Sequence, residues 1–165
     1  MRGRLRLELK ASNGETLAVR ESNNAVMQAG ARLVAELFAG RGTGITHMGV
    51  GTSDRAESES YNTLTLTNDA AAPLQGATEA ALPEDAFSAI ELDETQRVMR
   101  IRVRGTLPPA AAIGFVREAG LIARSGDTSV LYNRVTFAPL EKKDDHELTM
   151  FWEVTFPYGD LQWVM

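Results

Sequence analysis

A stretch of alternating residues near one end of the sequence most constrains the fold. In "LTMFWEVTF", residues 148–156, one side of an extended chain carries five apolar residues: Leu148, Met150, Trp152, Val154 and Phe156. A period of two residues is typical of a β-strand with one face in the core. The pattern therefore predicts a strand, and it places Trp152 in the core.

The segments around this strand have the same character. Residues 116–137 contain the apolar run "EAGLIA", a turn at "SGD" and a second run, "VLYNRVTF", and the polar loop "APLEKKDDHE" follows. Near the N-terminus, "RLRLELK" alternates, and "SNG" at 12–14 supplies turn residues. These patterns predict a β-hairpin over residues 4–22 and antiparallel strands over residues 116–156.

One segment has helical spacing instead. In "NNAVMQAGARLVAELFAG" the positions that share a face are Val26, Gly30, Leu33 and Leu37. Asn23 or Asn24 would cap the start, and Gly40 suits the end. The pattern predicts one principal α-helix near residues 24–39. Glycine in a helix costs about 1 kcal/mol relative to alanine, so we expect a close backbone contact at Gly30.

About eight strands and one helix fit into 165 residues. Short turns between sequential strands favour a mainly β (α+β) fold, and we predict a single domain, residues 1–165, built as an antiparallel β-sandwich. Residues 54–96 hold ten acidic residues and one basic residue, Arg55. We predict that residues 54–86 form a long acidic surface excursion.

The strand within "RVMRIRVRGTL" has an unusual polar face. Met99, Ile101 and Val103 alternate with Arg100, Arg102 and Arg104. Like charges on one strand face repel, so these arginines need acidic partners. A guanidinium suits such partners because it can donate two parallel hydrogen bonds to one carboxylate. The partners belong either to another protein or to this chain's own Asp and Glu residues. We predict interface roles for Arg100, Arg102, Arg104 and Trp163.

The sequence offers little for catalysis. It has no cysteine, which excludes disulfides, thiolate metal sites and cysteine nucleophiles. It has no phosphate-binding loop, dinucleotide fingerprint or nucleophile elbow. "DDHE" at 144–147 is the best metal candidate, but adjacent side chains of a tight loop point apart, which favours a solvated loop. We therefore predict a non-enzyme without catalytic residues, cofactor or metal.

Charge and hydropathy limit the partners. The net charge of −5 makes nucleic acid an improbable partner, because binding it requires a basic face. No run approaches the roughly 20 apolar residues of a membrane span. The N-terminal "MRGRLRLELK" lacks the apolar centre of a signal peptide.

Several of these segments together resemble a known family. The helix is followed by Met48 to Thr52, which is similar to a family strand of the form IxxIGVGTG. Later, Glu118 to Leu121 resembles a Glu-Ala-Gly-Leu strand of the family, and Leu131 to Phe137 resembles an LxxRxxF strand. Lys142 or Lys143 corresponds to a lysine-containing loop, and Leu148 to Phe156 resembles an aromatic LTITWxITF strand. This resembles the small tail-associated structural proteins of tailed bacteriophages and phage-like contractile injection systems, over residues 23–53 and 97–156.

The resemblance implies a non-enzymatic virion structural protein of a tail or baseplate. It would assemble in the host bacterial cytoplasm as a homo-oligomer, contact copies of itself and other tail or baseplate proteins, and serve as a candidate seat for a tail fibre. One alternative is a capsid decoration protein. Another is a carbohydrate-binding, receptor-recognising sandwich domain, with Trp152, Tyr158 and Trp163 as candidate sugar-stacking residues.

Overall fold

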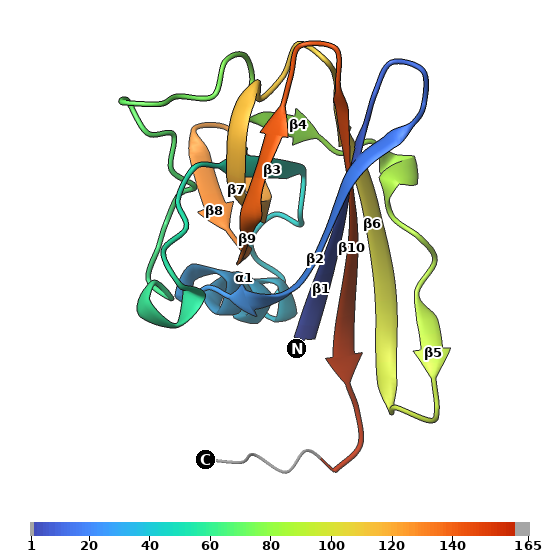
Figure 1. The fold of residues 1–165 in the computed structure, drawn as a ribbon. Coiled ribbons are helices and arrows are strands. Elements are labelled where there is room, and N and C mark those ends of the chain that lie inside the picture. Colours follow the sequence, from blue (N-terminus) through green and yellow to red (C-terminus); the bar gives the residue numbers. More distant parts are fainter. Residues whose placement is uncertain (1, 161–165) are drawn as a thin grey trace.

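The computed structural model describes residues 2–160 and confirms a mainly antiparallel β fold (Figure 1). Ten strands form one sheet in the order β4-β3-β7-β9-β2-β1-β10-β6-β5, with β8 paired to β7. The bounds of the strands are β1 Arg2–Lys10, β2 Thr16–Val26, β3 His47–Gly51, β4 Glu79–Ala81, β5 Glu91–Asp93, β6 Val98–Leu107, β7 Gly114–Ser125, β8 Thr128–Leu131, β9 Asn133–Lys142 and β10 Glu147–Pro157.

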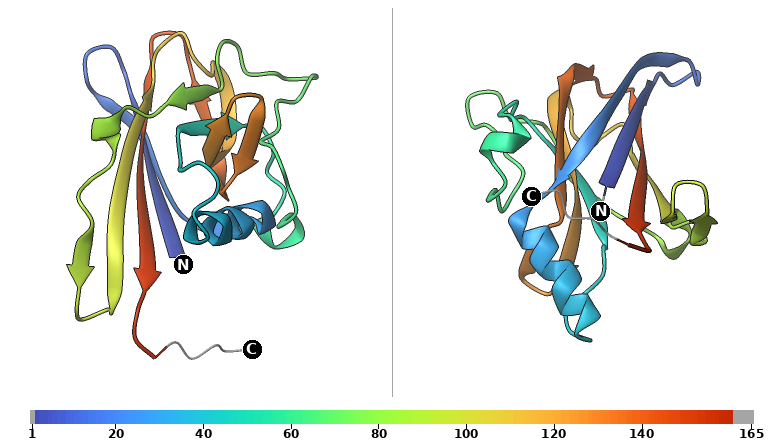
Figure 2. Two further views of the ribbon diagram at one scale, coloured as in Figure 1. Left: turned by 180° about the vertical axis from the view of Figure 1, so that it is seen from behind. Right: turned by 90° about the horizontal axis from the view of Figure 1, so that it is seen from below.

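The sheet curls into a half-barrel, so the predicted antiparallel β-sandwich is not confirmed in this respect. Strand β2 pairs with β1 along most of its length, but it also pairs with β9 through Ala25↔Arg134 and Val26↔Asn133. This short junction divides the sheet into one wall of β5, β6, β10, β1 and β2, and a second wall of β9, β7, β3, β4 and β8. Figures 1 and 2 show the two walls splayed around a common interior, with the helix at one end.

The first and last strands lie side by side. Strand β1 pairs with β10 from Arg2↔Thr155 to Lys10↔Glu147. Strand β10 pairs on its other side with β6, from Leu148↔Leu107 to Pro157↔Val98. The alternation predicted the N-terminal hairpin. Strand β10, which comes last in the sequence, holds this hairpin in the sheet by pairing with β1.

The helix α1 spans Gln28–Phe38 and is shorter than the predicted 24–39. The predicted cap is also wrong, because Asn23 and Asn24 remain in β2, and Met27 occupies the cap position without a side-chain hydrogen bond. The expected contact at Gly30 is confirmed: a Cβ there would lie 2.0 Å from the carbonyl oxygen of Tyr132. The backbone of α1 therefore packs directly on the chain between β8 and β9.

The core fills the space between the two walls. The predicted alternating positions on β1 and on β10 from Leu148 to Val154 are confirmed as buried, and Trp152 is 1% exposed. Phe156, which the same pattern placed in the core, is 38% exposed, so the prediction is wrong at that position. The second wall contributes larger buried runs, because β7 is covered on both faces along Glu118–Ala123. The buried apolar residues from the two walls include Leu5, Leu7, Val103, Met150, Met48, Val50, Val116, Leu121, Val135 and Leu140.

The acidic excursion, residues 54–86, runs over the second wall and then back to the first. It contains two short 3-10 turns, η1 Glu57–Glu59 and η2 Glu84–Ala86, and the three-residue strand β4. Most of its residues are exposed, but Ser60 and Leu74 are buried. Within residues 2–160, no helix has the length and apolar character needed to span a membrane.

Candidate functional site

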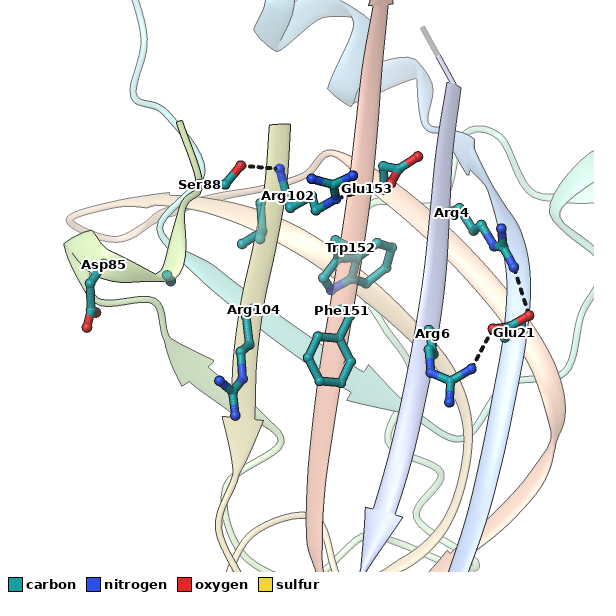
Figure 3. Close-up of a pocket in the computed structure, with 12 residues that line it drawn as sticks. Arg4, Arg6, Glu21, Asp85, Ser88, Arg102, Arg104, Phe151, Trp152 and Glu153 are labelled. Atoms are coloured by element: carbon teal, nitrogen blue, oxygen red, sulfur yellow. Dashed lines mark hydrogen bonds and ion pairs between the residues drawn. The ribbon is translucent and has the colours of Figure 1, made fainter. Parts of the chain in front are cut away.

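The outer surface of the first wall carries a cluster of arginines, which we call the arginine face: Arg4, Arg6, Arg102 and Arg104, with Phe151 between them (Figure 3). Strand pairing explains the cluster. Arg6 lies opposite Phe151 on β10, and Phe151 lies opposite Arg104 on β6. In the next row, Glu153 lies between Arg4 and Arg102.

The surface is hollowed over the arginine face. The hollow has a volume of about 530 Å³ and is bordered by Asp85 and Ser88 at the start of the segment that leads to β5. The hydroxyl of Ser88 accepts a hydrogen bond from the backbone amide of Arg102 at 2.9 Å, which ties this border to β6. The result is an open basin whose charged lining consists of four arginines and three carboxylates, those of Glu21, Asp85 and Glu153.

Glu21 of β2 organises one side of the basin. Its two carboxylate oxygens lie 2.7 Å from Arg6 and 2.8 Å from Arg4 (Figure 3). The hydrogen bond from Arg6, then that from Arg4, lowers the pKa of Glu21. Glu21 is therefore ionised at neutral pH and does not act as a proton donor there.

The predicted interface residues Arg100 and Arg102 are largely neutralised by the chain itself. Arg100 is 17% exposed and pairs with Asp93 at 3.0 Å and Glu153 at 3.2 Å. The hydrogen bond to Asp93 raises the pKa of Arg100. Arg102, at 50% exposure, pairs with Glu91 at 2.9 Å and Glu153 at 3.4 Å. Arg100 belongs to an internal network, whereas Arg102 still presents half of its surface to the basin.

Arg104 differs from the other two. Among residues 2–160, no carboxylate lies within ion-pair distance of its guanidinium, which instead stands over the ring of Phe151 at 5.6 Å from the centroid. A cation over an aromatic face gains about 0.5–1 kcal/mol at an exposed site. Its donors remain available for a carboxylate from elsewhere.

Sequence reasoning missed Arg4 and Arg6, although their alternation with Leu5 and Leu7 was visible. The missing information was that β10 lies between β1 and β6 and brings two arginine rows together. The fourth predicted interface residue, Trp163, lies outside the described residues, so its role stays a prediction.

A second polar cluster lies inside the molecule. Glu118 of β7 and Arg134 of β9 form an ion pair at 2.6 Å, and each side chain is only 1% exposed. Arg134 also donates to the carbonyl of Arg55 at 2.7 Å and the hydroxyl of Ser60 at 2.8 Å. Glu118 accepts from the amide of Thr67 at 2.7 Å. This buried pair fixes the beginning of the acidic excursion to the second wall.

Gly51 makes room for this pair. A Cβ at Gly51 would lie 2.3 Å from a carboxylate oxygen of Glu118 and 2.6 Å from the carbonyl oxygen of Thr67. Nearby, Glu57 accepts hydrogen bonds from the amide and hydroxyl of Thr136. Gly51, Glu118 and Glu57 together hold the beginning of the excursion against the second wall.

Lys142 is a further buried charged residue. Its ammonium donates to the carbonyls of Pro108 at 2.9 Å and Pro109 at 3.0 Å, which ties β9 to the loop after β6. Burial lowers the pKa of Lys142. The lysine thus stabilises a proline-containing bend rather than facing a substrate.

Neither histidine belongs to a reacting constellation in the described part of the chain. The Nδ1 of His47 lies 2.8 Å from the hydroxyl of Thr46. In the "DDHE" loop, the Nδ1 of His146 accepts from the amide of Lys143 at 3.1 Å. Within residues 2–160, no three His, Asp or Glu side chains gather into a metal-binding group.

No protein-family model, curated protein or solved structure matches this chain. The chemistry of the arginine face therefore has to be judged from its own residues. Guanidinium groups are permanently charged donors that do not exchange protons near neutral pH. The arginine face is suited to binding carboxylates and to stacking, and not to acid–base catalysis.

Proposed function

We propose that this chain is a non-enzymatic structural protein of a phage or phage-like tail or baseplate, which acts by assembling with copies of itself and with neighbouring tail proteins. The observation that carries the assembly role is Arg104, a cation on the arginine face with no carboxylate partner among the described residues. A basin lined by arginines and a phenylalanine has the composition that protein interfaces favour.

The surface of the same chain offers a complementary partner. The acidic excursion carries seven Asp and Glu residues and one Arg within residues 54–86. In this arrangement the arginine face of one copy contacts the excursion of the next. Such contacts join different surfaces, so they form a closed ring when the rotation between copies permits.

The assignment to a tail or baseplate rests on the sequence resemblance. The residues that carry it include Glu118 and Lys142, which are buried and connect separate segments of the fold. Motifs of this kind specify a scaffold, which is what a virion component requires. A tail fibre is a candidate partner at the arginine face.

Charge reversal tests the assembly role. We expect Arg104→Glu to shift the oligomer toward monomer in sedimentation velocity, and added salt to have the same effect because it screens exposed charges. Arg41→Glu, an exposed arginine beyond α1, is the matched control and should leave the mass unchanged. A wild-type monomer at every concentration, or an Arg104→Glu variant that retains the oligomeric mass, would contradict the proposal.

The particle assignment needs a separate measurement. Antibody labelling of purified particles from a host carrying this gene should mark the tail or baseplate. Labelling of the head would favour a decoration protein, and particles without label would refute a virion role.

A further inference from the structure

An apolar groove opens between α1 and the strands β6 and β10, on the opposite face of the first wall from the arginine face (Figure 1). Its volume is about 490 Å³, within the range of roughly 300–1,000 Å³ that is usual for binding pockets. Among the described residues that line it, only Arg100 is charged, and this arginine already pairs with Asp93 and Glu153. The apolar lining from the helix and the two strands includes Leu33, Val34, Leu37, Met99, Ile101, Val154 and Phe156.

The sheet side of the groove is a row of neighbouring side chains on three strands. Leu92 of β5 lies opposite Met99 of β6, and Met99 lies opposite Phe156 of β10, so the three share one face. Their side chains are 53%, 40% and 38% exposed. Ile90 and Leu37, which line the same groove, are 71% and 42% exposed. We call these five residues the groove patch.

The exposed area of the groove patch matches that of a dimer contact. With roughly 150–250 Å² for a large apolar side chain, the exposed fractions of the five residues amount to about 400–600 Å² per copy. A standard protein contact buries about 800 Å² per partner, of which about 450 Å² is apolar. The groove patch alone therefore supplies the apolar area that such a contact requires. Exposed apolar patches of this size mark surfaces that another group covers.

The charges around the groove patch favour a second copy of this chain as that group. In a two-fold contact the same surface of both copies meets, so a surface with a net charge would repel its counterpart. The groove patch is uncharged, and the charge of Arg100 beneath it is neutralised within the chain. The adjoining turn between β5 and β6 carries one acid and one base, Glu94 and Arg97. An apolar surface with a balanced border is complementary to itself.

We propose that the groove patch is a two-fold contact in which two copies of this chain cover each other's grooves. The contact uses the opposite face of the first wall from the arginine face, so it goes beyond the assembly proposed above and does not rest on it. Together with a ring formed through the arginine face, a two-fold contact pairs the copies of one ring with those of a second.

Salt separates the two contacts in an experiment. At about 1 M salt the Debye length is about 3 Å, so contacts between exposed charges are screened, whereas burial of apolar surface is not weakened in this way. Sedimentation velocity of the Arg104→Glu protein at this salt concentration therefore reports the groove contact alone. We expect a dimer that dissociates to monomer on dilution.

Two exposed loop residues supply the variant and its control. Ile90, at 71% exposure, lies before β5, and Ile90→Glu places a charge in the groove patch. Leu64 is 68% exposed, also lies outside the strands and does not line the groove. In the Arg104→Glu background, we expect Ile90→Glu to raise the dissociation constant of the dimer about 100-fold, because each of the two copies contributes about tenfold. Leu64→Glu should leave the constant unchanged, and Leu92→Glu repeats the test from β5.

A monomer at every concentration of the Arg104→Glu protein would overturn the proposal. An apolar dye that fluoresces on this monomer would assign the groove to a different partner. A dimer retained in both Ile90→Glu and Leu92→Glu, or lost equally in Leu64→Glu, would place the contact elsewhere.

The two proposals fail separately. A wild-type dimer whose mass Arg104→Glu leaves unchanged would refute assembly through the arginine face and leave the groove contact intact. A monomeric Arg104→Glu protein beside an oligomeric wild type would refute the groove contact alone.

Discussion

Replacing Arg134 with methionine gives a direct test of the buried ion pair. The substitution keeps an unbranched apolar side chain of similar reach but leaves Glu118 buried with backbone amides as its remaining partners, at 2.7 Å from Thr67 and 3.4 Å from Ser53. It also removes the donors to Arg55 and Ser60. Removing one member of a buried ion pair costs about 3–5 kcal/mol, because an uncompensated charge stays in the interior.

The loss should be visible in equilibrium unfolding. For domains of 150–250 residues each kcal/mol shifts Tm by about 2–4 °C, so Arg134→Met should lower Tm by about 6–20 °C. Urea unfolding followed by circular dichroism gives the free energy independently. Arg32→Met is the matched control. Arg32 pairs with Glu36 at 3.0 Å on the helix surface, and loss of such an exposed pair costs about 0.5 kcal/mol or less.

A double variant separates charge from packing. In Glu118→Gln with Arg134→Met, the amide oxygen still accepts from Thr67 but carries no charge. We expect it to recover about 0.5–3 kcal/mol relative to Arg134→Met alone, which is the usual coupling between contacting residues. The reasoning fails if Arg134→Met costs under about 1 kcal/mol, or if the double variant is less stable than the single one.

The other predictions concern Lys142 and Glu21. Lys142→Met leaves the carbonyls of Pro108 and Pro109 without their donor, so it should lower the free energy of unfolding in urea by about 1–3 kcal/mol. The control Lys143→Met, at the exposed neighbouring position, should leave this free energy nearly unchanged. Because the pKa of Glu21 is lowered in the folded state, the stability from its ion pairs is present above the ordinary carboxyl pKa and is lost as pH falls through the folded pKa. Wild type should therefore lose more stability than Glu21→Gln as pH falls below about 4.3, and parallel pH profiles of the two proteins would contradict this.

The strands were predictable where the evidence is local. Alternation in residues 4–10 and 148–156 identifies β1 and β10, because one face of each strand meets the core. The helix was predictable in type but not at its start. Asn23 and Asn24 have a poor preference for strands and a good one for caps, yet pairing with β1 extends β2 through both. Tertiary pairing overrode local preference there.

The buried polar residues could not be predicted as buried. Glu118 and Arg134 lie in segments identified correctly as strands, but their burial depends on the excursion, and Arg55 is 79 residues from Arg134 in sequence. For a similar reason, only part of the arginine face could be predicted. The arginines of β6 follow from the alternation in the sequence, but only the strand order shows that Arg4 and Arg6 of β1 lie on the same surface.

The position of β1 beside β10 has a consequence for synthesis on the ribosome. Strand β1 can pair with β2 as soon as the hairpin emerges, but its other side waits for residues 147–155. At about 5–20 residues per second, the wait is roughly 6–26 s. During this time the nascent protein presents a strand of nine residues with a free hydrogen-bonding edge and three leucines, Leu5, Leu7 and Leu9, without their final cover. Open edges of this kind pair readily with other chains, so protection by a chaperone matters most for this protein before translation ends.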